Sequence, residues 1–94
     1  MENELNPDRV DQAKKRLDAL RNQICECEDL LCQEMYSEYY CAVRGDDQEM
    51  MLYKNLNLRG IFDQMKGLIP IAQDMLTIIR KDYTNVNKRL SKED

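Results

Sequence analysis

Four cysteines are the residues of this chain with the most distinctive chemistry. Cys25, Cys27, Cys32 and Cys41 are an even set that could ligate zinc or form two disulfides. The Cys-x-Cys pair followed by a third Cys five residues later lacks the paired spacing and turn residues of a zinc knuckle. All four fall in one predicted helix, where Cys25 and Cys27 point about 200° apart and cannot be bridged. We therefore expect free thiols, buried or half-buried, with no metal.

The rest of the chain offers no set of residues that could carry catalysis. There is no His, so the usual general base and the base of a serine triad are missing. No glycine-rich phosphate loop follows a strand, and no spaced carboxylates suggest a pocket. We expect no enzymatic activity and no cofactor. The net charge of −4 argues against a nucleic-acid partner.

The composition predicts one small, all-α domain. Of the 94 residues 34% are charged and 43% hydrophobic, with 3 Gly and 2 Pro. This is too apolar for a disordered tail and too poor in turn residues for a many-stranded sheet protein. The acidic start, Met1 to Glu4, is followed by no apolar segment typical of a signal peptide. The longest apolar run, residues 68–72, is far too short to insert into a membrane. We expect a cytoplasmic or nuclear, reducing location.

A first long helix is predicted over residues 7–44. Asn6 is a typical N-cap, Pro7 suits the first helical position, and Asp8 places an acid in the first turn. Apolar positions then alternate in steps of three and four, and after Leu31 in steps of four, so the stripe drifts around the helix. The stripe consists of Val10, Ala13, Leu17, Leu20, Ile24, Cys27, Leu31, Met35, Tyr39 and Val43.

A turn at residues 45–47 and a second long helix over 48–91 follow. Gly45 suits a left-handed position after a helix, and Asp46 with Glu49 predicts a capping box. The two apolar stripes are out of phase, so the chain should reverse into an antiparallel hairpin. Pro70 should kink the second helix without ending it. The alternative is a break there, giving a monomeric three-helix bundle.

The second helix carries more apolar residues than one neighbouring helix can cover. Ile61, Leu68 and Met75 recur every seven residues beside the main stripe, and Ile71 and Ile78 widen it. We therefore expect a coiled coil or four-helix bundle formed by oligomerisation with helical partners, either a homodimer or a hetero-oligomer. The predicted interface comprises Leu58, Ile61, Phe62, Met65, Leu68, Ile69, Ala72, Met75, Leu76, Ile78, Ile79, Tyr83, Val86 and Leu90.

Charge and aromatic residues are unevenly distributed along the predicted rod. Residues 22–53 hold eight acids and one base, a net charge of −7, whereas residues 9–21 and 80–92 together have a net charge of +7. The hairpin should be acidic at its tip and basic at its open end. This polarity either orients a partner or joins acidic tips to basic ends in end-to-end association, or the charges are solvated without consequence for a partner. Tyr36, Tyr40 and Tyr53 at the tip are candidates for a secondary interface, because Tyr is common at interface hot spots.

Two segments carry a resemblance to known families. Asn57-Leu58-Arg59, Gly67-Leu68-Ile69-Pro70 and the stretch 73–78 resemble the second subunit of the biogenesis of lysosome-related organelles complex. Residues 80–90 are similar to the KxDL subunits of the related lysosome-positioning complex. Such proteins are small, helical, non-enzymatic subunits of elongated assemblies on endosomes and lysosomes. A long helix with a Pro also resembles small kinetochore subunits, and short helix-loop-helix chains occur among synaptonemal-complex proteins.

These observations predict a non-enzymatic helical scaffold or adaptor subunit, in endosome-lysosome trafficking by resemblance. The alternatives are a structural subunit of kinetochores or meiotic chromosomes, and a small helical inhibitor that docks one helix in a groove.

Overall fold

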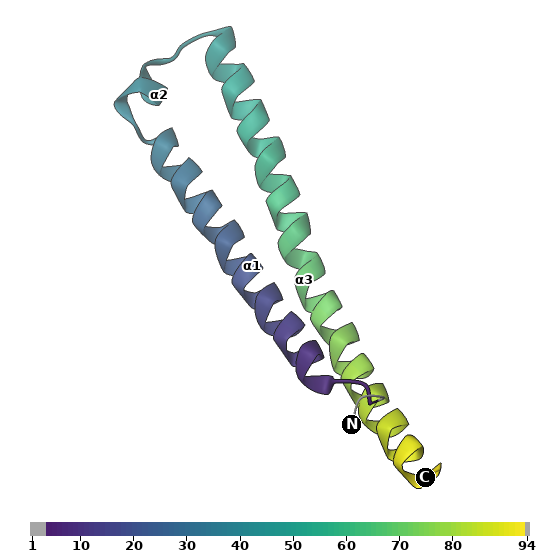
Figure 1. Ribbon diagram of the computed structural model, residues 1–94. Coiled ribbons are helices and arrows are strands. Elements are labelled where there is room, and N and C mark those ends of the chain that lie inside the picture. Colours follow the sequence, from purple (N-terminus) through teal and green to yellow (C-terminus); the bar gives the residue numbers. More distant parts are fainter. Residues whose placement is uncertain (1–3, 94) are drawn as a thin grey trace.

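The structure, a computed structural model, describes residues 4–93 and shows an elongated helical hairpin (Figure 1). The elements are α1 (Pro7–Met35), α2 (Glu38–Ala42) and α3 (Asp46–Glu93). No strand occurs within residues 4–93, which confirms the all-α class. The molecule extends over 74 × 17 × 15 Å, and α1 runs antiparallel to the central part of α3. The loop-and-α2 end is called the tip, and the other end the open end.

Helix α1 begins as its sequence predicts. The side chain of Asn6 accepts a hydrogen bond from the backbone N–H of Asp8 at 3.0 Å, and Pro7 occupies the first turn. An Asn at this position satisfies a backbone N–H that has no partner inside the helix.

The predicted helix over residues 7–44 is interrupted at Tyr36 and Ser37, which corrects its predicted end. Helix α1 ends at Met35, and Ser37 caps the separate short helix α2, its Oγ accepting from the backbone N–H of Tyr40 at 3.1 Å. A serine that bonds to the backbone in this way competes with helix continuation. The break comes just after the apolar stripe of α1 begins to drift, so a straight continuation would have rotated the stripe away from α3.

The turn into α3 lies earlier than predicted, over residues 43–45 and not 45–47. Gly45 has φ +70°, the left-handed conformation expected of it. However, α3 already begins at Asp46, and the N–H of Glu49 bonds to the carbonyl of Gly45 at 3.2 Å. Asp46 therefore lies within the first turn and is not the capping residue of a box. The acids at Asp46, Asp47 and Glu49 face the positive end of the helix dipole.

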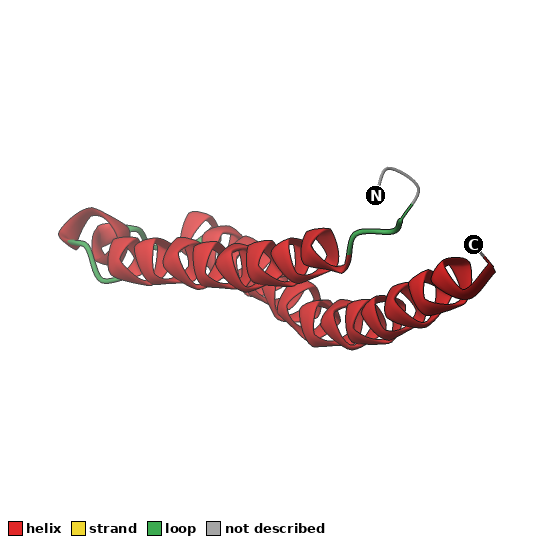
Figure 2. Ribbon diagram, turned by 60° about the horizontal axis from the view of Figure 1, so that its bottom comes forward, coloured by secondary structure: helices red, strands yellow, loops and turns green. Residues whose placement is uncertain are grey.

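Helix α3 continues through Pro70, as the sequence predicted. The alternative, a break at Pro70 that folds the chain back into a bundle, is therefore wrong. Figure 2 shows that α3 is bent along its length, so that it curves under α1. A proline inside a helix removes one backbone hydrogen bond and favours bending.

The interior of the hairpin is a single thin seam. Val10 and Ile24 of α1 and Ile69 of α3 are the buried apolar side chains, each 5–6% exposed. Leu17, Leu58, Phe62, Leu76 and Tyr83 are half-buried along the same seam. Two helices in contact leave most of each helix surface in solvent, so this core is small for the length of the chain.

Candidate helical interface

Polar pairs join α1 to α3 along one edge of the hairpin, which we call the polar flank. The bonded atoms are Nζ of Lys66 with Oε1 of Glu28 at 2.6 Å, Nε2 of Gln73 with Oδ1 of Asp18 at 2.6 Å, Nζ of Lys14 with Oγ1 of Thr77 at 2.8 Å, and Nε of Arg80 with both carboxylate oxygens of Asp11 at 2.9 and 3.0 Å. Successive residues are rotated by 100° around the helix axis. By this rotation, all the α1 positions lie on one side of the buried Ile24, and all the α3 positions lie on the matching side of the buried Ile69.

These pairs also fix the register between the helices. In Asp11–Arg80, Lys14–Thr77 and Asp18–Gln73 the two residue numbers add up to 91. A residue of α1 therefore lies level with the residue of α3 whose number brings the total to about 91. Nearer the tip the total rises to 94, in the pair Glu28–Lys66.

Electrostatics at the centre of the polar flank favour charged Lys66. A hydrogen bond from its ammonium to the Glu28 carboxylate raises the pKa of Lys66 above its ordinary value, although desolvation opposes this. Asp63, one turn earlier, adds a second carboxylate 3.5 Å from the same nitrogen. The side chains of Lys66 and Glu28 are only 25% and 19% exposed, so the pair ties the two helices together from a half-buried position.

The opposite edge of the hairpin is apolar and uncovered; we call it the apolar flank. In α3, Ile61 is 51% exposed, Leu68 62% and Met75 55%. No polar pair among residues 4–93 joins α1 to α3 across this edge. The apolar flank consists of Leu20, Cys27, Leu30 and Leu31 of α1 with Ile61, Met65, Leu68, Ala72 and Met75 of α3, and Ile71 and Ile78 extend it outward.

The predicted interface is thus divided into two sets. Leu58, Phe62, Ile69, Leu76, Ile79, Tyr83 and Val86 are buried or half-buried. Ile61, Met65, Leu68, Ala72, Met75, Ile78 and Leu90 remain exposed. Within a single hairpin, the excess apolar residues of α3 therefore stay in solvent.

The tip tyrosines occupy different environments. Tyr36 is 81% exposed and Tyr53 67%, whereas Tyr40 is half-buried and its hydroxyl accepts a hydrogen bond from Nδ2 of Asn55 at 2.9 Å. Tyr40 therefore holds α2 against α3. Tyr39, assigned by periodicity to the first stripe, is 87% exposed because the break before α2 turns it outward.

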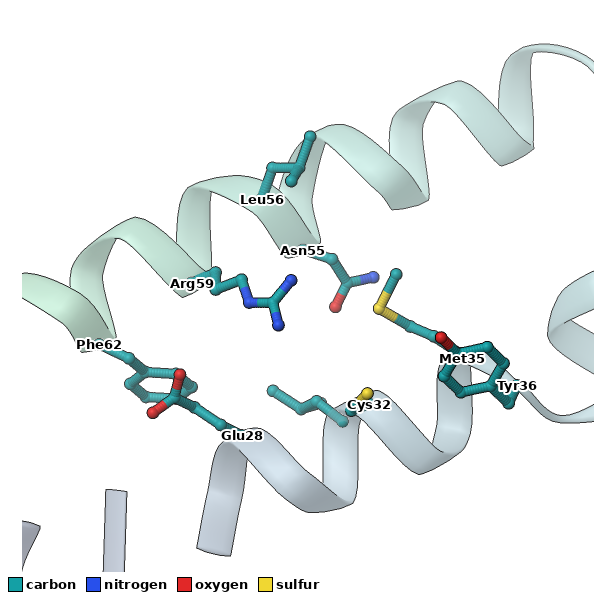
Figure 3. A pocket seen from close by; sticks show the side chains of 9 residues that line it. Glu28, Cys32, Met35, Tyr36, Asn55, Leu56, Arg59 and Phe62 are labelled. Carbon is teal, nitrogen blue, oxygen red and sulfur yellow. The ribbon is translucent and has the colours of Figure 1, made fainter. Parts of the chain in front are cut away.

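A groove of about 270 Å³ opens between α1 and α3 next to the tip (Figure 3). It is lined by Asn55, Leu56 and Arg59 of α3, by Met35 at the end of α1 and by Tyr36 just after it. Arg59 and Leu56 were not singled out from the sequence as site residues. Their position became visible only once the register of the two helices was known.

The cysteines are free, as expected, but all four are exposed, which corrects the prediction of buried or half-buried thiols. Cys27 lies on the apolar flank, while Cys25 and Cys32 lie toward the polar flank. The thiols are exposed because the seam buries only one narrow stripe of α1, and the cysteines lie outside that stripe. Within residues 4–93, no three His, Cys, Asp or Glu side chains are grouped as metal ligands would be.

No described helix combines the length and apolar character needed to cross a membrane. Comparisons with protein-family models, curated proteins and solved structures find no match. The functional case therefore depends on the geometry of the two flanks.

Proposed function

We propose that the chain is a non-enzymatic assembly subunit, a helical scaffold or adaptor that binds partner helices through its apolar flank. The observation that carries the proposal is the row of exposed apolar residues along the middle of α3, with Leu68 62% exposed and Ile71 60%. A contiguous apolar surface on a small chain is typical of a protein interface.

The energetic argument follows from the exposed fractions. Fully burying an aliphatic side chain is worth about 1.5–3 kcal/mol. Ile61, Leu68, Ile71, Met75 and Ile78 are about half exposed, so covering what remains is worth about 1 kcal/mol each. Together these residues supply several kcal/mol for association.

The thinness of the interior supports the same proposal. Among the residues whose side chains the structure describes, only Val10, Ile24 and Ile69 are buried, and small domains have a low free energy of unfolding. Partner helices on the apolar flank would turn the two-layer hairpin into a bundle with a central core. Folding of the hairpin and binding of the partner are then coupled.

The cellular setting is proposed from the resemblance of residues 57–78 and 80–90 to lysosome-related organelle and lysosome-positioning subunits. An assembly on endosomes or lysosomes is favoured over a kinetochore or synaptonemal setting. Proximity labelling with the tagged chain tests this, and enrichment of chromosomal proteins over endosomal ones would contradict it.

The assembly function is tested by light scattering of wild-type chain and a Leu68→Glu/Met75→Glu variant, alone and after co-purification. We expect the wild type to run as a complex and the variant as a helical monomer by circular dichroism. Asn22→Glu/Gln33→Glu is the matched control, since it adds the same charges at exposed positions away from the apolar flank. A wild-type monomer with a cooperative melt, unchanged by Leu68→Glu/Met75→Glu, would favour a small inhibitor instead.

A further inference from the structure

We propose that the occupant of the apolar flank is a second copy of this chain, docked antiparallel about a two-fold axis level with Pro70. This inference rests on the proposed assembly function and names its partner. Three observations support it: the symmetry of the α3 stripe, the distribution of charge, and the register between α1 and α3.

The α3 part of the apolar flank is self-complementary about position 70. Its inner row, extended by the half-buried Ile79, runs Ile61, Met65, Leu68, Ala72, Met75 and Ile79. A two-fold axis at 70 places Ile61 opposite Ile79, Met65 opposite Met75, and the large Leu68 opposite the small Ala72 of the other copy. Like residues meet at the ends and large meets small at the centre, which suits close packing between two copies.

The axis also lies at the middle of the rod. Helix α3 spans Asp46–Glu93, and Pro70 is at its centre. α1 overlaps α3 over roughly residues 57–84, about 40 Å at 1.5 Å per residue, and the molecule is 17 Å wide. Two hairpins laid antiparallel thus overlap along this whole length. The footprint given by this length and width is roughly 700 Å² per copy, the same order as the ~800 Å² per partner of a standard interface.

Charge selects the antiparallel arrangement over the parallel one. In the antiparallel dimer, each acidic tip (residues 22–53, net −7) lies beside the basic open end of the other copy (residues 9–21 and 80–92, net +7). A parallel dimer would bring the two acidic tips together. Complementary potentials of this kind set the orientation of docking.

The register of α1 provides an independent check. On the apolar-flank side of α1, Arg9 and Glu34 stand at opposite ends of one stripe of alternating four- and three-residue steps, and both are exposed. Within one copy, each α1 residue lies level with the α3 residue whose number brings the total to about 91–94. The two-fold axis at 70 pairs α3 residues of the two copies whose numbers total 140. It therefore pairs α1 residues of the two copies whose numbers total about 42–48. Arg9 and Glu34 add up to 43. The axis chosen from α3 thus places Arg9 of one copy beside Glu34 of the other.

A charge swap tests this contact. Within one chain Arg9 and Glu34 are 25 residues apart on a helix, about 38 Å, so they cannot pair internally. At low salt we expect Arg9→Glu or Glu34→Arg alone to raise the dimer Kd about tenfold, and the double variant to return it to within about threefold of wild type. The control variants are Lys15→Glu and Glu26→Arg, at exposed positions on the side of α1 that faces away from α3 and from the apolar flank. These changes should leave the dimer Kd unchanged. Additive losses in the double variant would overturn the proposed register.

Cross-linking tests the axis directly, in a background where the four native cysteines are serine. A mixture of Met65→Cys and Met75→Cys chains should form the mixed disulfide, whereas either variant alone should not, because like residues would stand about 15 Å apart along the axis. Efficient cross-linking of Met65→Cys chains to one another would overturn the antiparallel dimer.

Failure of this inference is distinguishable from failure of the assembly function. With a photo-cross-linker in place of Leu68 in cells, an adduct to a second copy supports the homodimer. An adduct to a different helical protein, with a monomeric purified chain, overturns the homodimer but leaves the assembly function standing. Absence of any adduct contradicts both.

Discussion

The two flanks of the hairpin are formed by the same pair of helices but differ in what their side chains do. The polar flank joins α1 to α3, whereas the apolar flank leaves apolar side chains exposed. On the polar flank, Gln73 and Lys66 bond across to α1, whereas on the apolar flank Leu68 and Met75 are 62% and 55% exposed. The hydrogen bonds fix register and orientation but contribute modest net stability. The apolar side chains carry the larger free energy, which becomes available only on association.

This difference shows how a short chain can be both a defined hairpin and an incomplete bundle. The polar pairs are directional and hold α1 at one register against α3, so the apolar flank is presented with a fixed spacing. Without them, two amphipathic helices with surplus apolar residues could pack in several rotations. The polar flank therefore specifies the hairpin, and the apolar flank specifies what the hairpin binds.

The largest predicted effect contrasts two adjacent residues, Ile69 and Leu68, which are 5% and 62% exposed. Ile69→Asp buries a charge in the seam and should abolish the cooperative melt, since even truncation of such a residue to Ala costs about 2–5 kcal/mol. Leu68→Asp should leave a melting transition but remove its dependence on chain concentration. Circular dichroism melts over a hundredfold range of concentration measure both. Equal effects of the two substitutions would contradict the separation of interior from apolar flank.

The sequence predicted that α3 has more apolar residues than its interior seam can hold. It did not predict which of these residues lie in the seam and which lie on the apolar flank. The spacing of Ile61, Leu68 and Met75 indicated apolar surface beyond one seam, and these residues are exposed in the hairpin. Periodicity alone could not tell which of two adjacent stripes faces α1. Phe62 and Met65 were therefore assigned together, although Phe62 is half-buried and Met65 is 40% exposed.

The polar flank was not predicted, for a physical reason. Pairs such as Asp18–Gln73 join residues 55 positions apart, and only the register of the two helices brings them together. The break at Ser37 was missed in a different way. The residues that cap helices also occur inside them, and here the capping bond from Ser37 Oγ, together with the drift of the stripe, prevailed over helix continuation.

A smaller effect is expected for Gln73, which bonds to two different residues of α1. Its Nε2 lies 2.6 Å from Oδ1 of Asp18 and 3.3 Å from the carbonyl oxygen of Lys14. Gln73→Ala should lower the free energy of unfolding by about 1 kcal/mol without changing the oligomeric mass. Urea unfolding with light scattering on the same samples measures both quantities. A change in mass would show that the polar flank also takes part in association.

The exposed pair Asp11–Arg80 should contribute less again. Its side chains are 41% and 45% exposed, and such surface pairs are worth about 0.2–1 kcal/mol. Asp11→Asn should lower the melting temperature slightly at low salt, and the difference from wild type should disappear at 1 M NaCl. A difference that persists at high salt would mean that Asp11 acts through packing or its neutral hydrogen bonds.

The smallest effect is a pH dependence at Lys66. Because the Glu28 hydrogen bond raises the pKa of Lys66 in the folded chain, this residue stabilises the hairpin fully below its unfolded pKa. The contribution is lost as the pH rises through the folded pKa. Lys66→Met should therefore be slightly less stable than wild type at pH 7, and the gap should close toward pH 12. Thermal melts of the two proteins at matched pH, taken as a difference, remove the titration of other lysines and tyrosines. A gap that stays unchanged up to pH 12 would contradict a stabilising role for the charged ammonium of Lys66.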